Sequence, residues 1–584
     1  MKEWFKSIII VLKYSVLPAI LKIVQAIISA LSIPFQLFCI QKLIDVLQNY
    51  ISGQASFEYI LMWSMLLMLT HLFSANIHFL NTFLDISIKK NLNDKLPDAI
   101  IERFSKIEYS CYEDSKSMDI LEKVGEKIQE KILQVFNDTI SFFSNIISII
   151  GVMLVISQIS WLFSIIFVII LFAIMLINYK SMYIMNNMFF NQSPKERELN
   201  YYCRLLSDKK SLFELKIFSC ISYIKNKWYH INKDLFKERI QINRKSQKYF
   251  LLSSLLNLFW IAVVIIYTIY KLKYNEIMLG LCISVLGSAI TLLSLVENTS
   301  YAFSNLTLNS MYIKYYIKFN KLPLIKFNQQ SNLSQTNKYT FEFVNVSFKY
   351  PNTDNYVLKD LNLKFNTDEK ISLVGENGAG KSTIIKLLCK LYSPDEGCIL
   401  INGVNINDIS YSSLHNIFSV VFQNFVRYNF TIRENIVLES IDKINEDNLI
   451  KGVMRKISLE NRLIDNLDTS LGKIEENGID LSTGQWQKLA VARCLFSNSN
   501  YAILDEPTAS LDPISESNVY ELFLNIIAQK GCLIISHRLA SARLSDKIFV
   551  LKNGKILEIG THEELIRLRG TYFEMFEKQS EWYK

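Results

Sequence analysis

The feature that most constrains this chain is a series of long apolar runs in its first 300 residues. Each run is long enough for a helix to cross the roughly 30 Å hydrocarbon core of a bilayer. We predict six membrane spans, near residues 15–45, 57–87, 138–159, 161–179, 249–272 and 275–298. The chain is 50% hydrophobic with a mean hydropathy of +0.18, which is too apolar for an ordinary soluble enzyme. The first part of the molecule is therefore expected to be an α-helical membrane domain.

The connections between these spans differ in charge. No Lys or Arg stands between Lys42 and Lys89, whereas the stretches 88–137 and 180–248 are rich in both. Because cationic connections stay in the cytoplasm, we expect the loop near 49–56 to face outward and both long stretches to face the cytosol. This arrangement predicts a multi-pass protein of the cytoplasmic membrane. Since Lys and Arg crowd these stretches, the formal charge of +8 does not indicate a nucleic-acid partner.

The two cationic stretches carry helical patterns, at 119–136 and 198–218, and they nearly lack Gly and Pro. We predict that the spans continue into the cytosol as two long helical extensions, which turn near 109–117 and 211–216. Residues 1–13 form an amphipathic pattern that is typical of a helix lying on the membrane surface.

A second domain follows the spans. Residues 326–337 are rich in Asn, Gln and Ser without an apolar period, which indicates a linker. Strand and helix patterns then alternate, as is typical of an α/β domain. We divide the chain into a membrane domain at 1–325, a linker at 326–337 and a second domain at 338–584. The nine Cys of the whole chain include no C-x-x-C pair and indicate neither a metal site nor a disulfide framework.

Within the second domain, an apolar strand pattern at 370–374 runs into a glycine-rich loop and then a helical pattern at 384–388. The spacing G-x-x-x-x-G-K-[ST] in this context is typical of a phosphate-binding loop, or P-loop. Its N–H groups surround a polyphosphate at a helix N-terminus. Lys381 is expected to reach the β- and γ-phosphates, and Ser382 to ligate Mg²⁺. The loop comprises Gly375, Glu376, Asn377, Gly378, Ala379, Gly380, Lys381, Ser382 and Thr383.

Two further segments carry the pattern of a phosphate site. The apolar run 501–504 ends in Asp505, which suits a carboxylate beside Mg²⁺, and in Glu506, a candidate to polarise an attacking water. Ser482 and Gly484 precede a helical run at 486–496, which indicates another anion-binding helix N-terminus.

The P-loop, the segment at 481–485 and the strand that ends in Asp505 follow one another in the order found in the ATP-binding cassette (ABC) transporters, which they resemble. The resemblance implies ATP and Mg²⁺ as cofactors. Leu481, Ser482, Thr483, Gly484 and Gln485 are similar to the family's signature motif, Leu-Ser-Gly-Gly-Gln. The resemblance implies that Tyr350 stacks on adenine, that Gln423 contacts Mg²⁺ and the membrane domain, and that Asp512 lies in the D-loop. It also implies that His537 senses the γ-phosphate.

The resemblance covers the whole chain, because six spans fused to one C-terminal cassette is the arrangement of exporter-type half-transporters. It implies that the signature of one cassette faces the P-loop of a second half-transporter, and a homodimer suffices since all elements of an ATP site are present. The segments 422–428, 485–488 and 511–516 look most like those of bacterial lantibiotic and related peptide exporters. We expect no peptidase domain before the first span.

Two positions depart from the family pattern. Thr483 replaces the first glycine of the signature, so its hydroxyl either donates to phosphate or its bulk slows closure. The motif before the signature, usually close to Gly-Glu-Arg-Gly, reads Glu475, Glu476, Asn477 and Gly478. The missing arginine leaves the interdomain contact to Glu476.

The sequence favours ATP-driven export of a peptide or amphipathic natural product by alternating access of a dimer. A lipid or multidrug exporter of the same architecture stays an alternative. An ATP-gated channel or regulator is a third possibility, against which an intact Glu506 argues. In the spans, His71 and His78 share a helix face and Glu297 ends the sixth span. Each lies on a cargo path, at a helix–helix contact or near the membrane interface.

Overall fold

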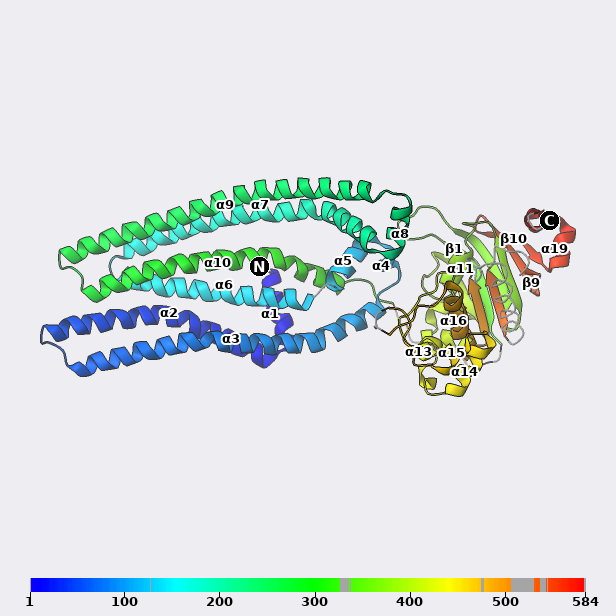
Figure 1. The fold of residues 1–584 in the computed structure, drawn as a ribbon, viewed down its shortest axis with the longest axis horizontal. Coiled ribbons are helices and arrows are strands. Elements are labelled where there is room, and N and C mark those ends of the chain that lie inside the picture. The colour runs from blue at the N-terminus through cyan, green and yellow to red at the C-terminus, as the bar shows by residue number, and fades with distance from the viewer. Residues whose placement is uncertain are drawn as a thin grey trace. The chain divides into compact units, whose positions relative to one another are not determined.

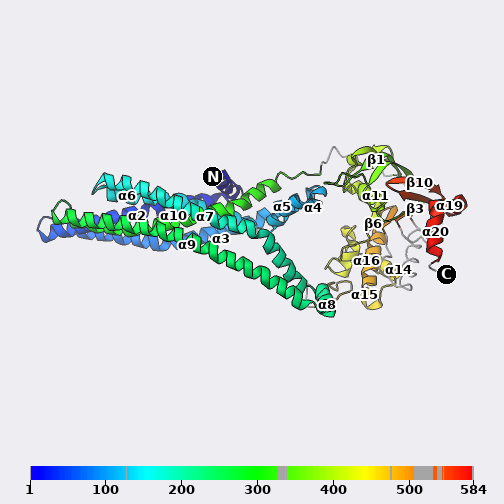
Figure 2. The same ribbon diagram turned by 90° about the horizontal axis from the view of Figure 1, so that it is seen from above.

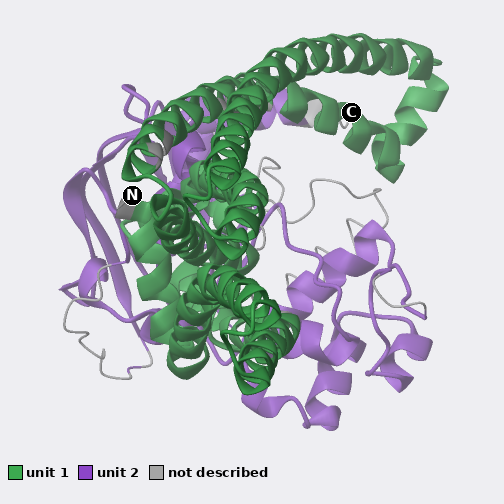
Figure 3. Cartoon of the chain, turned by 90° about the vertical axis from the view of Figure 1, so that its left-hand side faces the viewer, with its two compact units in different colours: residues 1–105, 119–322 green, residues 106–118, 323–584 purple. Residues whose placement is uncertain are grey.

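The computed structural model describes residues 2–125, 128–325, 336, 338–473, 477–505, 530–535, 542–543 and 545–581. Its contacts divide the chain into two compact units, which Figure 3 colours separately. Unit 1 comprises Met1–Ser105 and Asp119–Leu322, and unit 2 comprises Lys106–Met118 and Pro323–Lys584. The segment Lys106–Met118 groups with unit 2 although it lies between two spans in the sequence. The predicted domain boundaries at 325 and 338 stay a prediction.

Unit 1 is built from long helices (Figure 1). The helices from the N-terminus through the sixth span, with α4 and the start of α5 falling in unit 2, are α1 (Lys2–Tyr14), α2 (Val16–Ile51), α3 (Phe57–Lys106), α4 (Ser110–Glu113), α5 (Ser115–Gly125), α6 (Ile128–Ser157), α7 (Trp161–Ser207), α8 (Lys209–Ile217), α9 (Ile221–Lys273) and α10 (Leu279–Phe319). Among the described residues, six helices are long and apolar enough to cross a membrane: α2, α3, α6, α7, α9 and α10. The predicted six-span membrane fold is therefore confirmed.

Helix α6 packs along α10, and α2 packs along both, while α7 and α9 run side by side (Figure 1) and both lead to α8 (Figure 2). Both α7 and α9 also contact α10. Buried side chains such as Leu37, Val152 and Val285 fill the contacts between helices. Outward side chains such as Ile169 and Ile266 are 65% and 68% exposed, as expected where lipid is the solvent.

The predicted extensions of the spans are helical in the described residues, and the second is interrupted. In the first, α5 covers Ser115–Gly125 and α6 starts at Ile128. Helix α7 ends at Ser207, because Asp208 accepts a hydrogen bond from the backbone N–H of Ser211 at 2.9 Å and caps a new helix. The stretch 211–216, predicted as a turn, is therefore part of the short helix α8.

The described residues of unit 2 form two sheets (Figure 1). The four-stranded sheet has the order β2-β1-β4-β5 and is antiparallel; the six-stranded sheet has the order β10-β9-β3-β8-β7-β6, in which only β10 is antiparallel to its neighbour. The strands are β1 (Thr340–Phe348), β2 (Leu358–Asn366), β3 (Lys370–Gly375), β4 (Glu396–Ile401), β5 (Val404–Asn405), β6 (Phe418–Val421), β7 (Tyr501–Asp505), β8 (Gly531–Ile535), β9 (Lys547–Lys552) and β10 (Lys555–Gly560).

Helices cover this sheet core, which confirms the predicted α/β class. They are α11 (Lys381–Leu388), α12 (Tyr411–Ile417), α13 (Ile432–Val437), α14 (Asp447–Lys456), α15 (Asn461–Asp465), α16 (Thr483–Phe496), α19 (His562–Leu568) and α20 (Thr571–Glu581), with 3-10 turns at Ile406–Asp408 and Ile441–Lys443. The two strands predicted at 340–344 and 346–348 form the single strand β1. Its register shifts around Asn345, which has a φ of +48°.

The charge distribution of the connections predicts the topology of the spans. Gln54, in the exposed connection between α2 and α3, and Lys210, exposed on α8, are suitable positions for introduced cysteines. In a background with Cys203, Cys220, Cys389 and Cys398 replaced by Ser, we expect an impermeant maleimide to label Gln54→Cys from outside intact cells. We expect it to label Lys210→Cys only after permeabilisation. The opposite pattern would reverse the orientation.

Candidate functional site

The parallel strands of the large sheet bring the predicted phosphate-site segments to one edge. Strand β3 ends at Gly375, β7 at Asp505, β6 at Val421 and β8 at Ile535. The register pairs Leu373 with Ile535, Asp505 with Ile535, and Val421 with Leu504, so these ends are level. Ligands bind beyond the carboxyl ends of the strands in open α/β sheets. This edge is therefore the expected site.

The loop after β3 requires glycine at two positions. Gly378 and Gly380 have φ values of +81° and +106°, a backbone conformation that side chains disfavour. A Cβ atom on Gly380 would also lie 2.7 Å from the Leu358 side chain. The loop thus curls tightly before α11, with its backbone free to approach a ligand.

Lys381, the first residue of α11, is held against this loop. It is 5% exposed, and its ammonium group donates hydrogen bonds to the carbonyl oxygens of Gly375 at 2.8 Å and Glu376 at 3.0 Å. The ammonium group is therefore already positioned at the loop.

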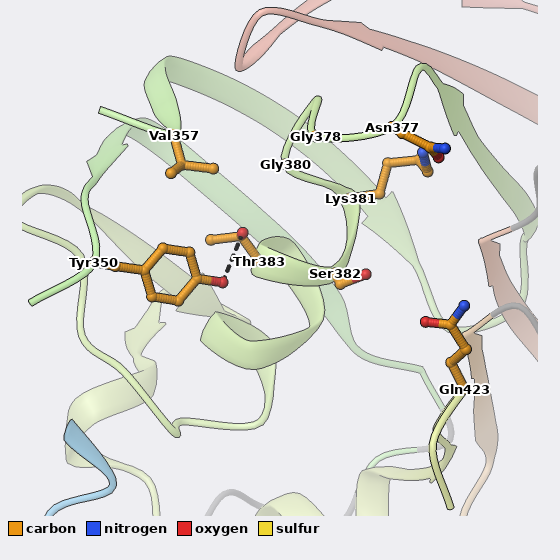
Figure 4. Close-up of a pocket in the computed structure, with 9 residues that line it drawn as sticks. All are labelled: Tyr350, Val357, Asn377, Gly378, Gly380, Lys381, Ser382, Thr383 and Gln423. Atoms are coloured by element: carbon orange, nitrogen blue, oxygen red, sulfur yellow. Dashed lines mark hydrogen bonds between the residues drawn. The ribbon is translucent and has the colours of Figure 1, made fainter. Parts of the chain in front are cut away.

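A cavity of about 530 Å³ opens over this loop (Figure 4). Its lining contains most of the predicted nucleotide-binding residues, namely Tyr350, Asn377, Gly378, Gly380, Lys381, Ser382, Thr383 and Gln423, together with Val357. Gly375, Glu376 and Ala379 belong to the loop but do not line the cavity. Val357 was not predicted from the sequence, because nothing marks an isolated Val before a strand as a ligand contact.

Tyr350 stands at one end of the cavity. Its hydroxyl lies 3.0 Å from that of Thr383, as Figure 4 shows. Its ring packs against Phe348 and Tyr392, with centroids 5.2 and 5.6 Å away. The Lys386 ammonium group lies 4.8 Å from the ring centroid. The aromatic ring is thus fixed by its neighbours, which were not predicted.

Within unit 2, α4 contributes to the surroundings of Tyr350. Tyr109, which precedes α4, packs edge-on against Tyr392 at 5.5 Å, and Glu113 lies 3.4 Å from the Lys386 ammonium group. Burial opposes the charge on Lys386, but Tyr350 and Glu113 outweigh it and raise the pKa of this lysine. Burial and then Glu113 raise the pKa of Tyr392. The cationic Lys386 is therefore shared between Tyr350 and a segment between two spans.

The residues predicted to hold Mg²⁺ offer a hydroxyl, an amide and a carboxylate. Ser382 and Gln423 line the cavity, and Asp505, 6% exposed, ends the neighbouring strand β7. Oxygen donors of these kinds are the ligands that Mg²⁺ prefers. The donor set therefore fits this cation, although Asp505 does not line the cavity itself.

The predicted signature residues lie at the start of α16 and do not line this cavity. Ser482 is the N-cap: its hydroxyl accepts from the N–H of Gln485 at 3.3 Å, and the Gln485 side chain accepts from the N–H of Ser482 at 2.9 Å. Thr483 is exposed and Gly484 is half-buried. A serine hydroxyl that accepts one hydrogen bond still has a proton to donate.

Several predicted residues lie outside the described residues: Glu506, Asp512, His537, Glu475 and Glu476. Their roles stay predictions. Glu506 directly follows the end of β7, and His537 stands two residues beyond the end of β8, so the sequence attaches both to strand ends at the same edge.

Comparison with known proteins agrees with this geometry. The family model described as "ABC transporter" matches residues 358–509. The subtilin transport ATP-binding protein of Bacillus subtilis is 33% identical over 531 residues, 87% of this chain and 83% of that protein. The nisin transport ATP-binding protein of Lactococcus lactis subsp. lactis is 30% identical over 502 residues, 84% of this chain and 82% of that protein.

A solved structure shows the same fold along nearly the whole chain. The structure of a bacterial Atm1-family ABC exporter with ATP bound matches with a TM-score of 0.76 and 20% identity, over 97% of this chain and 98% of that one. The relatives match this chain across both its six apolar helices and its α/β cassette. The chain therefore belongs to the ABC transporters, as an exporter-type half-transporter with an ATPase cassette at its C-terminal end.

Proposed function

We propose that this half-transporter dimerises and exports a peptide or amphipathic natural product, driven by ATP hydrolysis in the cytosol. The observation that carries the proposal is the extent of the similarity to the subtilin transport protein, which spans 87% of this chain. The matched length of 531 residues exceeds the cassette and includes much of the part that would meet the cargo. A lipid or multidrug exporter stays the alternative.

In this proposal the cavity over the P-loop binds ATP with Mg²⁺. Tyr350 stacks on the adenine, while the backbone of residues 375–383 and the Lys381 ammonium group hold the phosphates. Ser382, Gln423 and Asp505 would hold Mg²⁺, which neutralises charge on the phosphates. These residues line the cavity or end the adjacent strand, which supports their assignment.

Glu506 acts in the proposal as the base that polarises the attacking water, and His537 contacts the γ-phosphate. The second half of each ATP site comes from the partner's cassette. There Ser482, Thr483, Gly484 and Gln485 at the start of α16, with Asp512, face the ATP held by the other protomer. An exposed N-terminus of α16 is compatible with this role, because its N–H groups favour an anion.

The proposed export is tested by transport into inside-out vesicles. We expect ATP-driven uptake of at least one member of an amphipathic peptide panel that includes subtilin and nisin. Glu506→Gln removes the general base, so ATP turnover should fall by roughly 10²-fold or more and uptake should cease, while ATP binding persists. ATP-driven movement of a fluorescent phospholipid, without uptake of any peptide, would instead favour the lipid exporter.

The stacking role of Tyr350 predicts a difference between two substitutions. Tyr350→Leu should weaken ATP binding about tenfold, since stacking a base on an aromatic ring contributes about 1–3 kcal/mol. Tyr350→Phe keeps the ring and loses the hydroxyl, with its contacts to Thr383 and Lys386, so its Kd for ATP should stay close to that of the parent. Tripolyphosphate, which has no base, is the control and should bind all three proteins equally. Equal ATP affinity of the Leu variant would remove Tyr350 from the adenine site.

Thr483 is the position where the signature departs from the family. We expect its side chain to crowd the approach to phosphate, so Thr483→Gly should raise ATP turnover by no more than about fivefold, the factor of a single hydrogen bond of about 1 kcal/mol. Thr483→Val keeps the shape without the hydroxyl and should leave turnover unchanged. If both substitutions slow steady-state hydrolysis, the hydroxyl contacts phosphate and the crowding hypothesis is wrong.

A further inference from the structure

A second cavity, of about 330 Å³, lies within the membrane-spanning unit. It is formed by α6, α7 and α10, and its lining residues are Phe142, Met175, Leu176, Asn178, Tyr179, Thr299, Ser300 and Phe303. The sequence did not single out any of them. Two of the candidates that it did single out in the spans, His71 and Glu297, are exposed and do not line this cavity.

Aromatic rings form one wall of the cavity. The Phe303 ring centroid lies 5.9 Å from that of Phe142 and 6.1 Å from that of Tyr179. Behind this wall, the buried Trp4 of α1 packs edge-on against both Phe142 and Phe303 at 5.8 Å. Aromatic pairs in this geometry stabilise each other beyond the area they bury. The wall is therefore held in place without a ligand, as in a preformed binding site.

Asn178 is one of the polar side chains in the lining, with Tyr179, Thr299 and Ser300. It is 9% exposed, and its amide nitrogen donates a hydrogen bond to the Ser300 hydroxyl at 2.6 Å. Its carbonyl oxygen Oδ1 has almost no exposed surface, and among the described residues it accepts no hydrogen bond. A buried acceptor without a donor is unfavourable, so a ligand that shifts this side chain slightly and supplies an N–H or O–H gains affinity by pairing with it.

These features select the occupant. An acyl chain of a lipid fits an aromatic wall but has no donor for Asn178 Oδ1. A volume of about 330 Å³ is at the lower end of the range for ligand pockets, which suits one side chain and its amide rather than a whole peptide. An amphipathic peptide supplies both an apolar side chain and a backbone N–H.

We propose that this cavity is a cargo subsite, in which an apolar or aromatic side chain of an amphipathic peptide packs against Phe142, Tyr179 and Phe303 while its backbone N–H donates to Asn178 Oδ1. The inference rests on the proposed peptide export and adds to it the place and the chemistry of recognition. It makes Asn178 a specificity-determining residue for peptides over acyl chains.

The test uses the full-length transporter in lipid nanodiscs and a radiolabelled amphipathic decapeptide amide that carries a benzophenone group. Its twin has the same side chains but N-methylated backbone amides, so it lacks the N–H donors. On the parent protein, we expect photolabelling of α7 and α10, with the twin needing an approximately fivefold higher concentration for half-maximal labelling. That factor corresponds to one hydrogen bond of about 1 kcal/mol.

A substitution completes the cycle. In Asn178→Leu, the concentration of decapeptide for half-maximal labelling should rise about fivefold and equal that of its twin, because the acceptor has been removed. Asn76→Leu is the matched control: Asn76 is an exposed asparagine of the α3 span that donates to the carbonyl of Leu72 in its own helix. Labelling of this control should equal that of the parent. The comparison of the two peptides on the parent protein stands even if Asn178→Leu does not fold.

Three results would overturn the subsite: equal affinity of the twins for the parent protein, labelling confined to other helices, or a photoactivatable stearoyl lipid that labels this cavity and is not displaced by the decapeptide. The proposed export can fail separately. If the decapeptide labels this cavity as expected but ATP drives no peptide into vesicles, the subsite stands and export is wrong. If uptake proceeds unchanged in Asn178→Leu with label elsewhere, export stands and the subsite is wrong.

Discussion

The parallel pairing of four strands is the constraint on which the cassette depends. Parallel strands must leave the sheet at the same edge, so β3, β8, β7 and β6 deliver their following residues to one place. That place receives the P-loop, Asp505 and Gln423, which are far apart in the sequence. The tight turn at Gly378 and Gly380 then sets the P-loop backbone around the cavity, and Lys381 is already held at the loop by its carbonyls.

The membrane unit obeys a different constraint. In a bilayer, every backbone polar group needs an internal partner, so each span is a helix. The spans therefore differ from one another only in their side chains. Most of those side chains are apolar and identify no cargo. A buried polar atom without a partner is costly in such surroundings, which is why the Asn178 carbonyl beside an aromatic wall carries more information than exposed polar residues such as His71.

The surroundings of Tyr350 add a feature that neither constraint explains alone. Its ring lies under the Lys386 ammonium group, which also meets Glu113 from the segment between the second and third spans. Within unit 2, the end of the nucleotide cavity is therefore in contact, through one lysine, with residues that the chain places next to a membrane helix. A change in the position of Tyr350 on binding a base would alter the same cation that Glu113 contacts.

The sequence by itself determined the six spans, the α/β class of the cassette and most of the nucleotide cavity, because each depends on local patterns. Bilayer thickness requires long apolar runs, and a phosphate loop requires glycines and a lysine at fixed spacing. The turn of the second extension was predicted at 211–216, just after the break that Asp208 makes by capping α8, because the helical pattern at 198–218 runs across that break. Only the tertiary structure decided that Val357 lines the nucleotide cavity with Tyr350, that Lys386 lies over the Tyr350 ring, and that Asn178, Phe142 and Phe303 line one cavity. Those contacts join separate elements through packing, and a single sequence carries no periodic signal for them.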